Sequence, residues 1–352
     1  MAGSRAEAGR AYIGSFTAAG GRGIVTAALD PKDGSLTLLD ATDELPDPSY
    51  LTLADGLLYA VSETEDGAVA AFRTEPSAPL ALAAPPAPVD GASPTHLSVW
   101  GDRVLTANYG SGSVSSVRLR ADGIPDAAAT EVHQHTGGGP HPQRQQSPHA
   151  HQVLPDPSGN WALAVDLGTD SVRTYAKAPG ADSGLLPHHE TALRPGSGPR
   201  HLAFHPSGSV AYVLNELAPT LTVCAWDATI GTLKPLLEIP VLTADTTSTG
   251  DAYPSALVVA PDGRFLWTAT RGADLISLFT LDPTGEEPTL HGTVPCGGAW
   301  PRDLALDPSG RFLYAANERS GDVTWFTVDR ESGVPVRGGS APLPAPSCVV
   351  FG

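Results

Sequence analysis

Five residues of this chain could together hydrolyse an ester or hold an anion, if folding brings them to one place. They are two histidines, two arginines and a glutamate: His149, His151, Arg200, Glu216 and Arg271. A neutral imidazole titrates at about pH 6.5 and can take a proton from water near neutrality. Guanidinium groups stay charged and bind carboxylates, phosphates and developing oxyanions. These residue types favour base-catalysed attack of water on a carbonyl carbon, with the glutamate orienting one of the other groups.

Histidine is unevenly distributed along the chain. Nine of the eleven histidines lie between His133 and His205. His149 and His151 are two residues apart, so on a strand their side chains point the same way. The pair could also bind a metal ion, but zinc and similar ions need a third or fourth ligand, which Asp166 or Glu216 would have to supply. The residues leave open whether a metal binds and which histidine is the base.

The elements that must position these residues are short strands in a repeat. Seven prolines each open a short apolar run, at spacings of 45 to 55 residues: Pro48, Pro94, Pro148, Pro199, Pro254, Pro301 and Pro346. Most runs continue as strand, glycine-containing turn, strand, polar turn and strand, with apolar and polar residues alternating. A repeat of this length that is built only from short strands is typical of a β-propeller.

The two ends of the chain complete one blade. Residues 11–30 supply later strands without a first strand, and residues 346–352 form a first strand with nothing after it. Joining them closes a ring and removes exposed sheet edges. The predicted fold is therefore an all-β, seven-bladed β-propeller closed by its C-terminal strand. We expect residues 1–10 to be a flexible N-terminus and residues 11–352 to be a single domain.

Stacking the repeats places two sets of residues at the same end of the ring, because each second strand returns to end beside the start of the first. One set follows the prolines: Ser49, Thr95, His149, Arg200, Ser255, Arg302 and Ser347. The other set ends the second strands: Ser62 and Glu63, Asn108 and Tyr109, Asp166 and Leu167, Asn215 and Glu216, Thr270 and Arg271, Asn317 and Glu318. The same stacking assigns His151 to a position that is leucine or valine in the other units, so we expect an imidazole at a core position.

Charge and composition exclude some functions. The net charge of −17 argues against nucleic acid and against anionic membranes as partners. The N-terminal residues lack the apolar segment of a signal peptide, and no run has membrane-spanning length. Three cysteines without metal-ligand spacing are expected to be reduced and buried: Cys224, Cys296 and Cys348. We therefore expect a cytoplasmic protein, and a monomer because the ring is closed.

Several longer motifs make the chain resemble a known family. They are PHPQRQQSPHAH, VDLGTDSV, GPRHLAFHPSG, VLNEL and PSGRFLYAANE, and the resemblance runs from YIGSFT to PSCVVF. The chain is similar to the seven-bladed propeller lactonases, which include bacterial 6-phosphogluconolactonases of the propeller type and the fungal 3-carboxy-cis,cis-muconate lactonizing enzyme. Two departures lie in the sixth repeat, where Val258 replaces the family's histidine and Thr270 replaces an asparagine.

The resemblance implies an activity and a set of residues. It implies hydrolysis of a small lactone, with or without a phosphate group, in carbohydrate metabolism and the pentose phosphate pathway, without a cofactor or a metal. The family's histidine, arginine, glutamate and second arginine fall on His149 or His151, Arg200, Glu216 and Arg271. Further substrate contacts are expected from Arg144, Gln145, Asp166, Asn215 and Arg302. Two alternatives stay open, namely cycloisomerisation of a muconate-type acid and a propeller that binds a ligand without catalysis.

Overall fold

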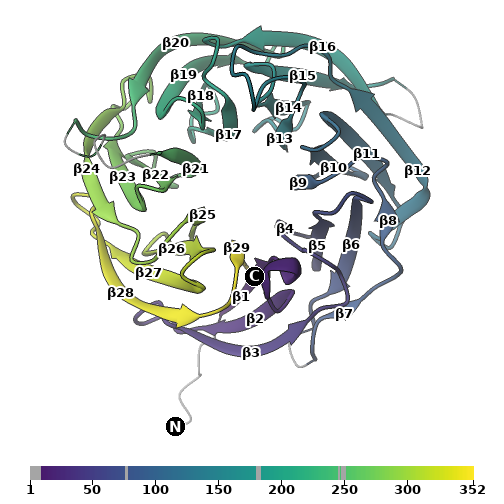
Figure 1. Ribbon diagram of the computed structural model, residues 1–352, viewed down its shortest axis with the longest axis horizontal. Helices are drawn as coiled ribbons and strands as arrows, with labels where there is room; N and C mark the ends of the chain where they lie inside the picture. Colours follow the sequence, from purple (N-terminus) through teal and green to yellow (C-terminus); the bar gives the residue numbers. More distant parts are fainter. Residues whose placement is uncertain (1–8, 76–77, 180–183, 245, 247–250) are drawn as a thin grey trace.

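The computed structural model describes residues 9–75, 78–179, 184–244, 246 and 251–352. Seven antiparallel sheets stand around a central axis as the blades of a β-propeller, which confirms the predicted fold class (Figure 1). The expected flexible segment 1–10 lies mostly outside the described residues, and Gly9 and Arg10 already belong to the first strand. The helical structure of the described residues is one 3-10 turn, Thr17–Ala19. None of the helical segments described is long and apolar enough to cross a membrane.

The ring closes as the ends of the sequence predict. The first blade has the strand order β29 (Pro346–Phe351), β1 (Gly9–Ser15), β2 (Ile24–Leu29) and β3 (Leu36–Thr42). Strand β29 pairs antiparallel with β1, with Ile13 opposite Val349. Strands from the two ends of the chain therefore form one sheet, in which β1 is paired on both sides.

The remaining blades follow in chain order. The second contains β4 (Leu51–Ala54), β5 (Leu57–Ser62), β6 (Ala68–Arg73), β7 (Ala81–Leu82) and β8 (Ala87–Pro88). The third contains β9 (Pro94–Trp100), β10 (Arg103–Asn108), β11 (Ser113–Leu119) and β12 (Pro125–Gln134). The fourth contains β13 (Ala150–Pro155), β14 (Trp161–Asp166), β15 (Ser171–Lys177) and β16 (Leu185–Ala192).

The last three blades are built in the same way. The fifth contains β17 (Pro199–Phe204), β18 (Val210–Asn215), β19 (Thr220–Asp227) and β20 (Thr232–Pro240). The sixth contains β21 (Tyr253–Val259), β22 (Phe265–Arg271), β23 (Leu275–Thr280) and β24 (Thr289–Pro295). The seventh contains β25 (Pro301–Leu306), β26 (Phe312–Asn317), β27 (Asp322–Val328) and β28 (Pro335–Pro342).

Packing between neighbouring blades forms the core. Apolar residues of adjacent sheets interleave, as where Leu163 and Val165 of β14 pack with Leu202 of β17 and Val213 of β18. The first hairpin of the later blades turns at a glycine with positive φ, such as Gly208 (φ 74°) and Gly310 (φ 66°), which L-residues with a side chain rarely adopt. These turns fix the length of each hairpin, and so they determine which residues reach the end of the ring opposite to the turns.

The register explains how that opposite end is built. In the fifth blade Pro199 pairs with Asn215 and His201 pairs with Leu214, so Arg200 is an extra, bulged residue between two paired positions. The same bulge occurs at the start of β9, β25 and β29. A bulge re-aims the side chain that it carries. The residue after each proline is therefore directed by local backbone geometry.

The fourth blade corrects one prediction. There Ala150 pairs with Asp166 and Gln152 pairs with Val165, so His151 is the bulged residue and is equivalent to Arg200. Val153, which pairs with Ala164, takes the apolar position that corresponds to Leu202. The expectation that His151 occupies a core position, with His149 equivalent to Arg200, is wrong because β13 begins two residues beyond Pro148 instead of at it.

Candidate active site

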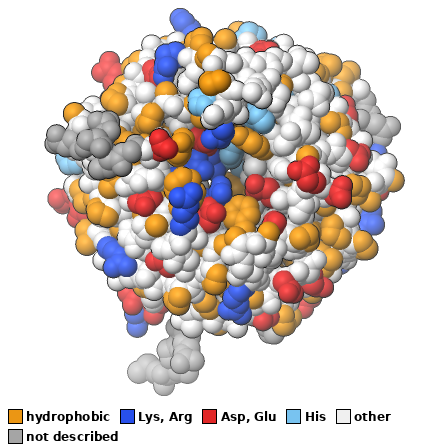
Figure 2. All heavy atoms as spheres, viewed as in Figure 1, with side chains coloured by type: hydrophobic (Ala, Val, Ile, Leu, Met, Phe, Trp, Pro, Cys, Tyr) orange, Lys and Arg blue, Asp and Glu red, His pale blue; other side chains and the backbone are white. Residues whose placement is uncertain are grey.

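A cavity of about 390 Å³ opens at the centre of one end of the ring. Basic side chains gather in this hollow, although the chain as a whole is strongly acidic (Figure 2). Bulged positions of the inner strands and residues that follow the second strands meet in its wall, together with loop residues. The lining residues are Phe16, Ser49, Tyr50, Glu63, Thr95, Tyr109, Arg144, His151, Arg200, His201, Glu216, Tyr253, Arg271, Trp300, Arg302 and Ser347.

Glu216 is the centre of the charged cluster. It directly follows β18, is 3% exposed, and forms ion pairs with three arginines. The distances are 2.7 Å to Arg144 Nη2, 3.3 Å to Arg200 Nε and 2.7 Å to Arg271 Nη2. Burial alone would raise the pKa of Glu216, but Arg271, Arg200 and Arg144 together lower it to about 2. The carboxylate is thus ionised and orients three cations from three different parts of the chain.

Each arginine has its own support. Arg200 is 5% exposed, and burial followed by repulsion from Arg271 lowers its pKa to about 9, so it stays charged at neutral pH. Its guanidinium also donates to Ser255 O and lies 3.3 Å from His201 Nε2. Arg271 lies 5.6 Å from the centre of the Trp300 ring, within the range of a cation–π contact. The cluster holds three positive charges against one negative charge.

Arg144 comes from a loop that crosses from the third blade to the fourth. Its Nη2 donates to Tyr109 Oη at 3.1 Å as well as to Glu216, and its side chain is 35% exposed. The predicted ligand Gln145 is buried and does not line the cavity. Its amide donates to Leu167 O and Asp170 Oδ1 and accepts from His141 N, so it fixes the loop that presents Arg144.

His151 is the histidine that reaches the cavity. It is 7% exposed, and its Nδ1 is a buried atom without a hydrogen-bond partner among the described residues. Burial and then the charge of Arg200 lower the pKa of His151 well below its ordinary value, so the imidazole is neutral. His149 does not line the cavity: its ring stacks on Tyr109 at 4.5 Å and its Nδ1 lies 2.9 Å from Tyr109 O.

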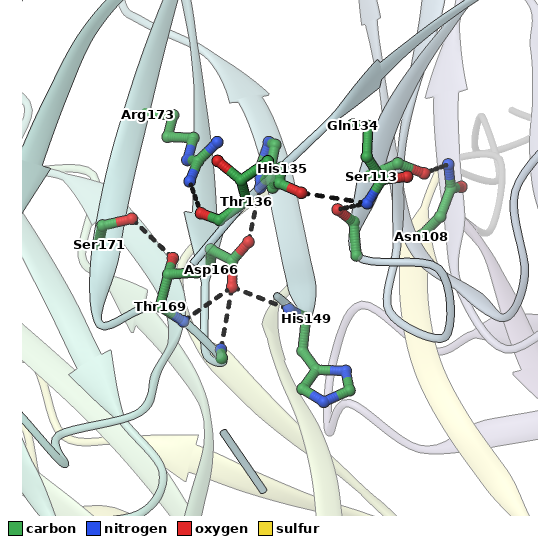
Figure 3. Close-up of polar contacts among 12 residues, drawn as sticks. Asn108, Ser113, Gln134, His135, Thr136, His149, Asp166, Thr169, Ser171 and Arg173 are labelled. Carbon is green, nitrogen blue, oxygen red and sulfur yellow. Dashed lines mark hydrogen bonds and ion pairs between the residues drawn. The ribbon is translucent and has the colours of Figure 1, made fainter. Parts of the chain in front are cut away.

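The other predicted contacts hold the backbone. Asp166 is fully buried below the cavity rim, where its carboxylate lies 2.5 Å from His135 Nδ1 and accepts from the backbone amides of His149, Gly168 and Thr169 (Figure 3). Asn215 donates to Thr220 and Thr222, and Asn108 makes the same kind of contact with Ser113 and Ser115. Asn215 and Asn108 are therefore bonded within their own blades, whereas Asp166 also bonds His135, which follows the third blade; none of the three lines the cavity. Arg302 does line the cavity, paired with Glu318.

The floor of the cavity is a layer of residues beneath the bulged positions, and the repeat pattern was not used to predict it. His201 lies 5.3 Å from His151, 5.8 Å from His96 and 6.3 Å from Tyr50, measured between ring centres. Burial followed by Arg200 lowers the pKa of both His201 and His96, for His96 to about 3. Burial raises the pKa of Asp303 to about 7. Polar residues recur at the position that follows the bulged residue in the repeats, so comparing that position across the repeats could have predicted this layer.

The two departures from the family pattern lie away from the cavity. Val258 pairs with Trp267 inside the sixth blade, and Thr270 is fully buried at the end of β22. Neither is a lining residue. Within the described residues, no group of three or more histidine, cysteine, aspartate or glutamate side chains is arranged to hold a metal ion. The site that is present consists of a neutral imidazole beside a cationic cluster on a seven-bladed propeller, the arrangement of a propeller enzyme for a small carbonyl compound.

Comparison with known proteins agrees with this class. Residues 10–351 match the family described as lactonase, 7-bladed beta-propeller. The chain is 34% identical over 276 residues to the 6-phosphogluconolactonase of Bacillus subtilis, covering 77% of each protein. The chain belongs to the seven-bladed β-propeller lactonases.

Solved structures extend the similarity to the whole ring. A Bacteroides fragilis protein, named provisionally as a 6-phosphogluconolactonase, superposes with a TM-score of 0.92 at 27% identity over 100% of both chains. A periplasmic gluconolactonase of Pseudomonas aeruginosa superposes with a TM-score of 0.90 at 30% identity, over 97% of this chain and 98% of the other.

Proposed function

We propose that the protein hydrolyses a sugar lactone in the central cavity, with His151 as the general base. The observation that carries the proposal is a neutral, buried imidazole that lines the same cavity as Arg200, Arg271 and Glu216, and whose Nδ1 finds no hydrogen-bond partner in the part of the chain that the structure describes. Relatives named as 6-phosphogluconolactonase and gluconolactonase support this choice of reaction. His149 is the weaker candidate because its Nδ1 is engaged by the backbone of Tyr109.

The chemical steps follow from these groups. A water oxygen attacks the lactone carbonyl carbon while His151 takes one of its protons. The carbonyl oxygen becomes an oxyanion, which Arg200 stabilises. When the ring C–O bond breaks, the imidazolium returns its proton to the leaving alkoxide oxygen, so His151 ends neutral and the products are a hydroxyl and a carboxylic acid. Glu216 takes no part in proton transfer, because its low pKa keeps it ionised, and it orients the arginines.

The charge of the cluster favours an anionic lactone. Three arginines surround a single carboxylate, so two positive charges are left uncompensated in a largely buried site. A phosphate group can bind such a site through paired hydrogen bonds from guanidinium groups. We therefore propose a phosphorylated sugar lactone as the preferred substrate, with Arg144 and Arg271 as the groups nearest to the phosphate.

The test is hydrolysis of 6-phosphoglucono-δ-lactone by the purified protein in a pH-stat, corrected for the spontaneous rate and run with and without EDTA. The expected result is fast turnover that survives EDTA and exceeds turnover of unphosphorylated glucono-δ-lactone. Arg200→Ala should reduce the rate by about 10²–10³-fold, the usual cost of losing one oxyanion donor. Turnover of a muconate-type acid but of no lactone would contradict the proposal.

We further propose that the protein acts in the cytoplasm as a monomeric single domain, without a metal or cofactor. Cys224, Cys296 and Cys348 are all buried and free, as expected in a reducing compartment. The net charge of −17 disfavours nucleic acid and anionic membranes as partners. Cell fractionation and size-exclusion chromatography test the location and the oligomeric state, and the P. aeruginosa relative shows that a periplasmic location is the alternative to measure against.

A further inference from the structure

The bulged positions of the seven inner strands form one ring around the axis. Its members are Ser347, Ser49, Thr95, His151, Arg200, Ser255 and Arg302, by the register of their blades. Two of the four hydroxyls in this ring have structural partners: Thr95 donates to His151 O at 3.0 Å, and Ser255 donates to Pro301 O at 2.6 Å. These two hydroxyls tie neighbouring inner strands together.

The other two hydroxyls have no such partner. Ser49 is 4% exposed and Ser347 is 5% exposed, both line the cavity, and neither Oγ makes a hydrogen bond within the described residues. Glu63, which also lines the cavity, lies beside Ser49: burial raises the pKa of its carboxyl group, and the Ser49 hydroxyl lowers it in part. A buried hydroxyl without a partner is unfavourable, so its presence in a cavity wall points to a partner that the ligand supplies.

The position of these two serines defines a second wall. Ser347 is on β29, and Ser49 lies two residues before the start of β4. Their adjacent blades lie across the central opening from β17 and β18, which carry Arg200 and lead to Glu216 (Figure 1). The neighbouring lining residue Phe16 contributes an apolar ring, over which the Arg302 guanidinium lies at 4.8 Å. One wall of the cavity thus carries the arginine cluster, and the opposite wall offers hydroxyls, a carboxyl group, an aromatic ring and Arg302, whose charge is paired with Glu318.

We propose that Ser49 and Ser347 form a hydroxyl-recognition subsite, which makes the enzyme select polyhydroxylated lactones over lactones without ring hydroxyls. This inference rests on the proposed function. A serine hydroxyl offers one donor and two acceptor positions, so it can pair with a sugar hydroxyl in either sense, which a guanidinium cannot do. A site built to bond a substrate hydroxyl rejects the analogue that lacks it, because the buried polar groups of the site are then left unpaired.

The experiment compares glucono-δ-lactone, which carries ring hydroxyls, with δ-valerolactone, which carries none. We expect kcat/KM of the wild-type enzyme to favour glucono-δ-lactone by at least 10²-fold. Ser347→Ala and Ser49→Ala should each reduce that ratio about tenfold, by lowering turnover of the sugar lactone and leaving δ-valerolactone within about twofold. The matched control is Ser98→Ala in β9, which removes a buried hydroxyl that also lacks a partner but lies outside the cavity lining. It should leave the ratio unchanged.

Three outcomes separate the inference from the function on which it rests. A selective fall in sugar-lactone turnover in the two serine variants supports the subsite. An equal fall on both substrates, or no change on either, overturns the subsite while lactone hydrolysis stands. A wild-type protein that hydrolyses neither these lactones nor 6-phosphoglucono-δ-lactone contradicts the proposed function itself, and the subsite with it. Thermal unfolding of each variant shows whether a fall comes from loss of folded protein.

Discussion

Replacing Glu216 by glutamine tests the charged cluster as a unit. Glutamine keeps the size and shape of the side chain but removes the single negative charge among Arg144, Arg200 and Arg271. Breaking a buried ion pair from one side is strongly destabilising, because it leaves the remaining charges uncompensated. The variant should therefore be less stable than the wild type, and its three guanidinium groups should lie further apart because no carboxylate joins them.

The pKa of Glu216 gives the size of the effect. The folded protein lowers it from 4.5 to about 2. A shift of one pKa unit corresponds to about 1.4 kcal/mol, so ionised Glu216 contributes about 3 kcal/mol to the free energy of unfolding relative to its neutral form. Because the folded pKa lies below the unfolded one, this contribution is complete above pH 4.5 and is lost as the pH falls toward 2. Glu216→Gln should thus cost about 3 kcal/mol at pH 7, and less at pH 4.

Urea unfolding followed by tryptophan fluorescence measures this, since the chain has six tryptophans. The control is Glu318→Gln, which also removes an arginine partner, but from a pair with side chains that are 20% and 26% exposed. That change should cost less than about 1 kcal/mol. If Glu216→Gln costs no more than Glu318→Gln at pH 7, the cluster is not the buried, mutually dependent assembly described above, and the reasoning is refuted.

Three more predictions concern Arg144, Asp303 and His96. Arg144→Gln should raise KM for a phosphorylated lactone at least tenfold with little change in kcat, because Arg144 lies at the cavity mouth and pairs with Glu216; steady-state kinetics with an unchanged KM would contradict this. Burial raises the pKa of Asp303 from 3.8 to about 7, so the wild type loses stability as the pH rises from 3.8 to 7. Asp303→Asn should therefore stabilise the protein by up to about 4 kcal/mol above pH 7 and by almost nothing near pH 4. Urea unfolding at pH 4 and pH 8 checks the sign of this change. Burial lowers the pKa of His96 from 6.5 to about 3, so between these pH values the unfolded chain binds a proton that the folded chain does not. His96→Gln should therefore reduce the slope of stability against pH below pH 6.5 by about 1.4 kcal/mol per pH unit. An unchanged slope in acid unfolding would show that His96 protonates in the folded state.

Two features could be predicted from the sequence: the closed ring, and the meeting at one end of it of the residues that follow the prolines with the residues that end the second strands. Repeats of the same strand–turn–strand pattern impose equivalent positions, so the end of β18 at Asn215 and the end of β26 at Asn317 lie beside Pro199 and Pro301 as expected. Closure by the C-terminal strand followed from the missing first strand at the N-terminus. These features depend only on strand periodicity and on the need to pair every inner strand.

What the repeat did not predict depends on local contacts outside it. In the fourth blade the Asp166 carboxylate accepts from the backbone amide of His149, which lies just before the inner strand (Figure 3). The register of that strand then makes His151 the bulged residue. The approach of Arg144 to Glu216 depends on the folding of a loop around Gln145. Contacts of this kind join residues with no common place in the repeat, so stacking the repeats cannot find them.

The most direct test of the central claim is the rate of lactone hydrolysis by His151→Gln beside the wild type, with His149→Gln as the matched control. If His151 is the general base, its replacement should lower kcat for 6-phosphoglucono-δ-lactone by about 10²–10⁴-fold, with KM nearly unchanged. His149→Gln should change kcat by only a few fold, because His149 does not line the cavity and its ring stacks on Tyr109, which does. A His151→Gln enzyme with wild-type kcat, or a larger loss in His149→Gln, would contradict the account.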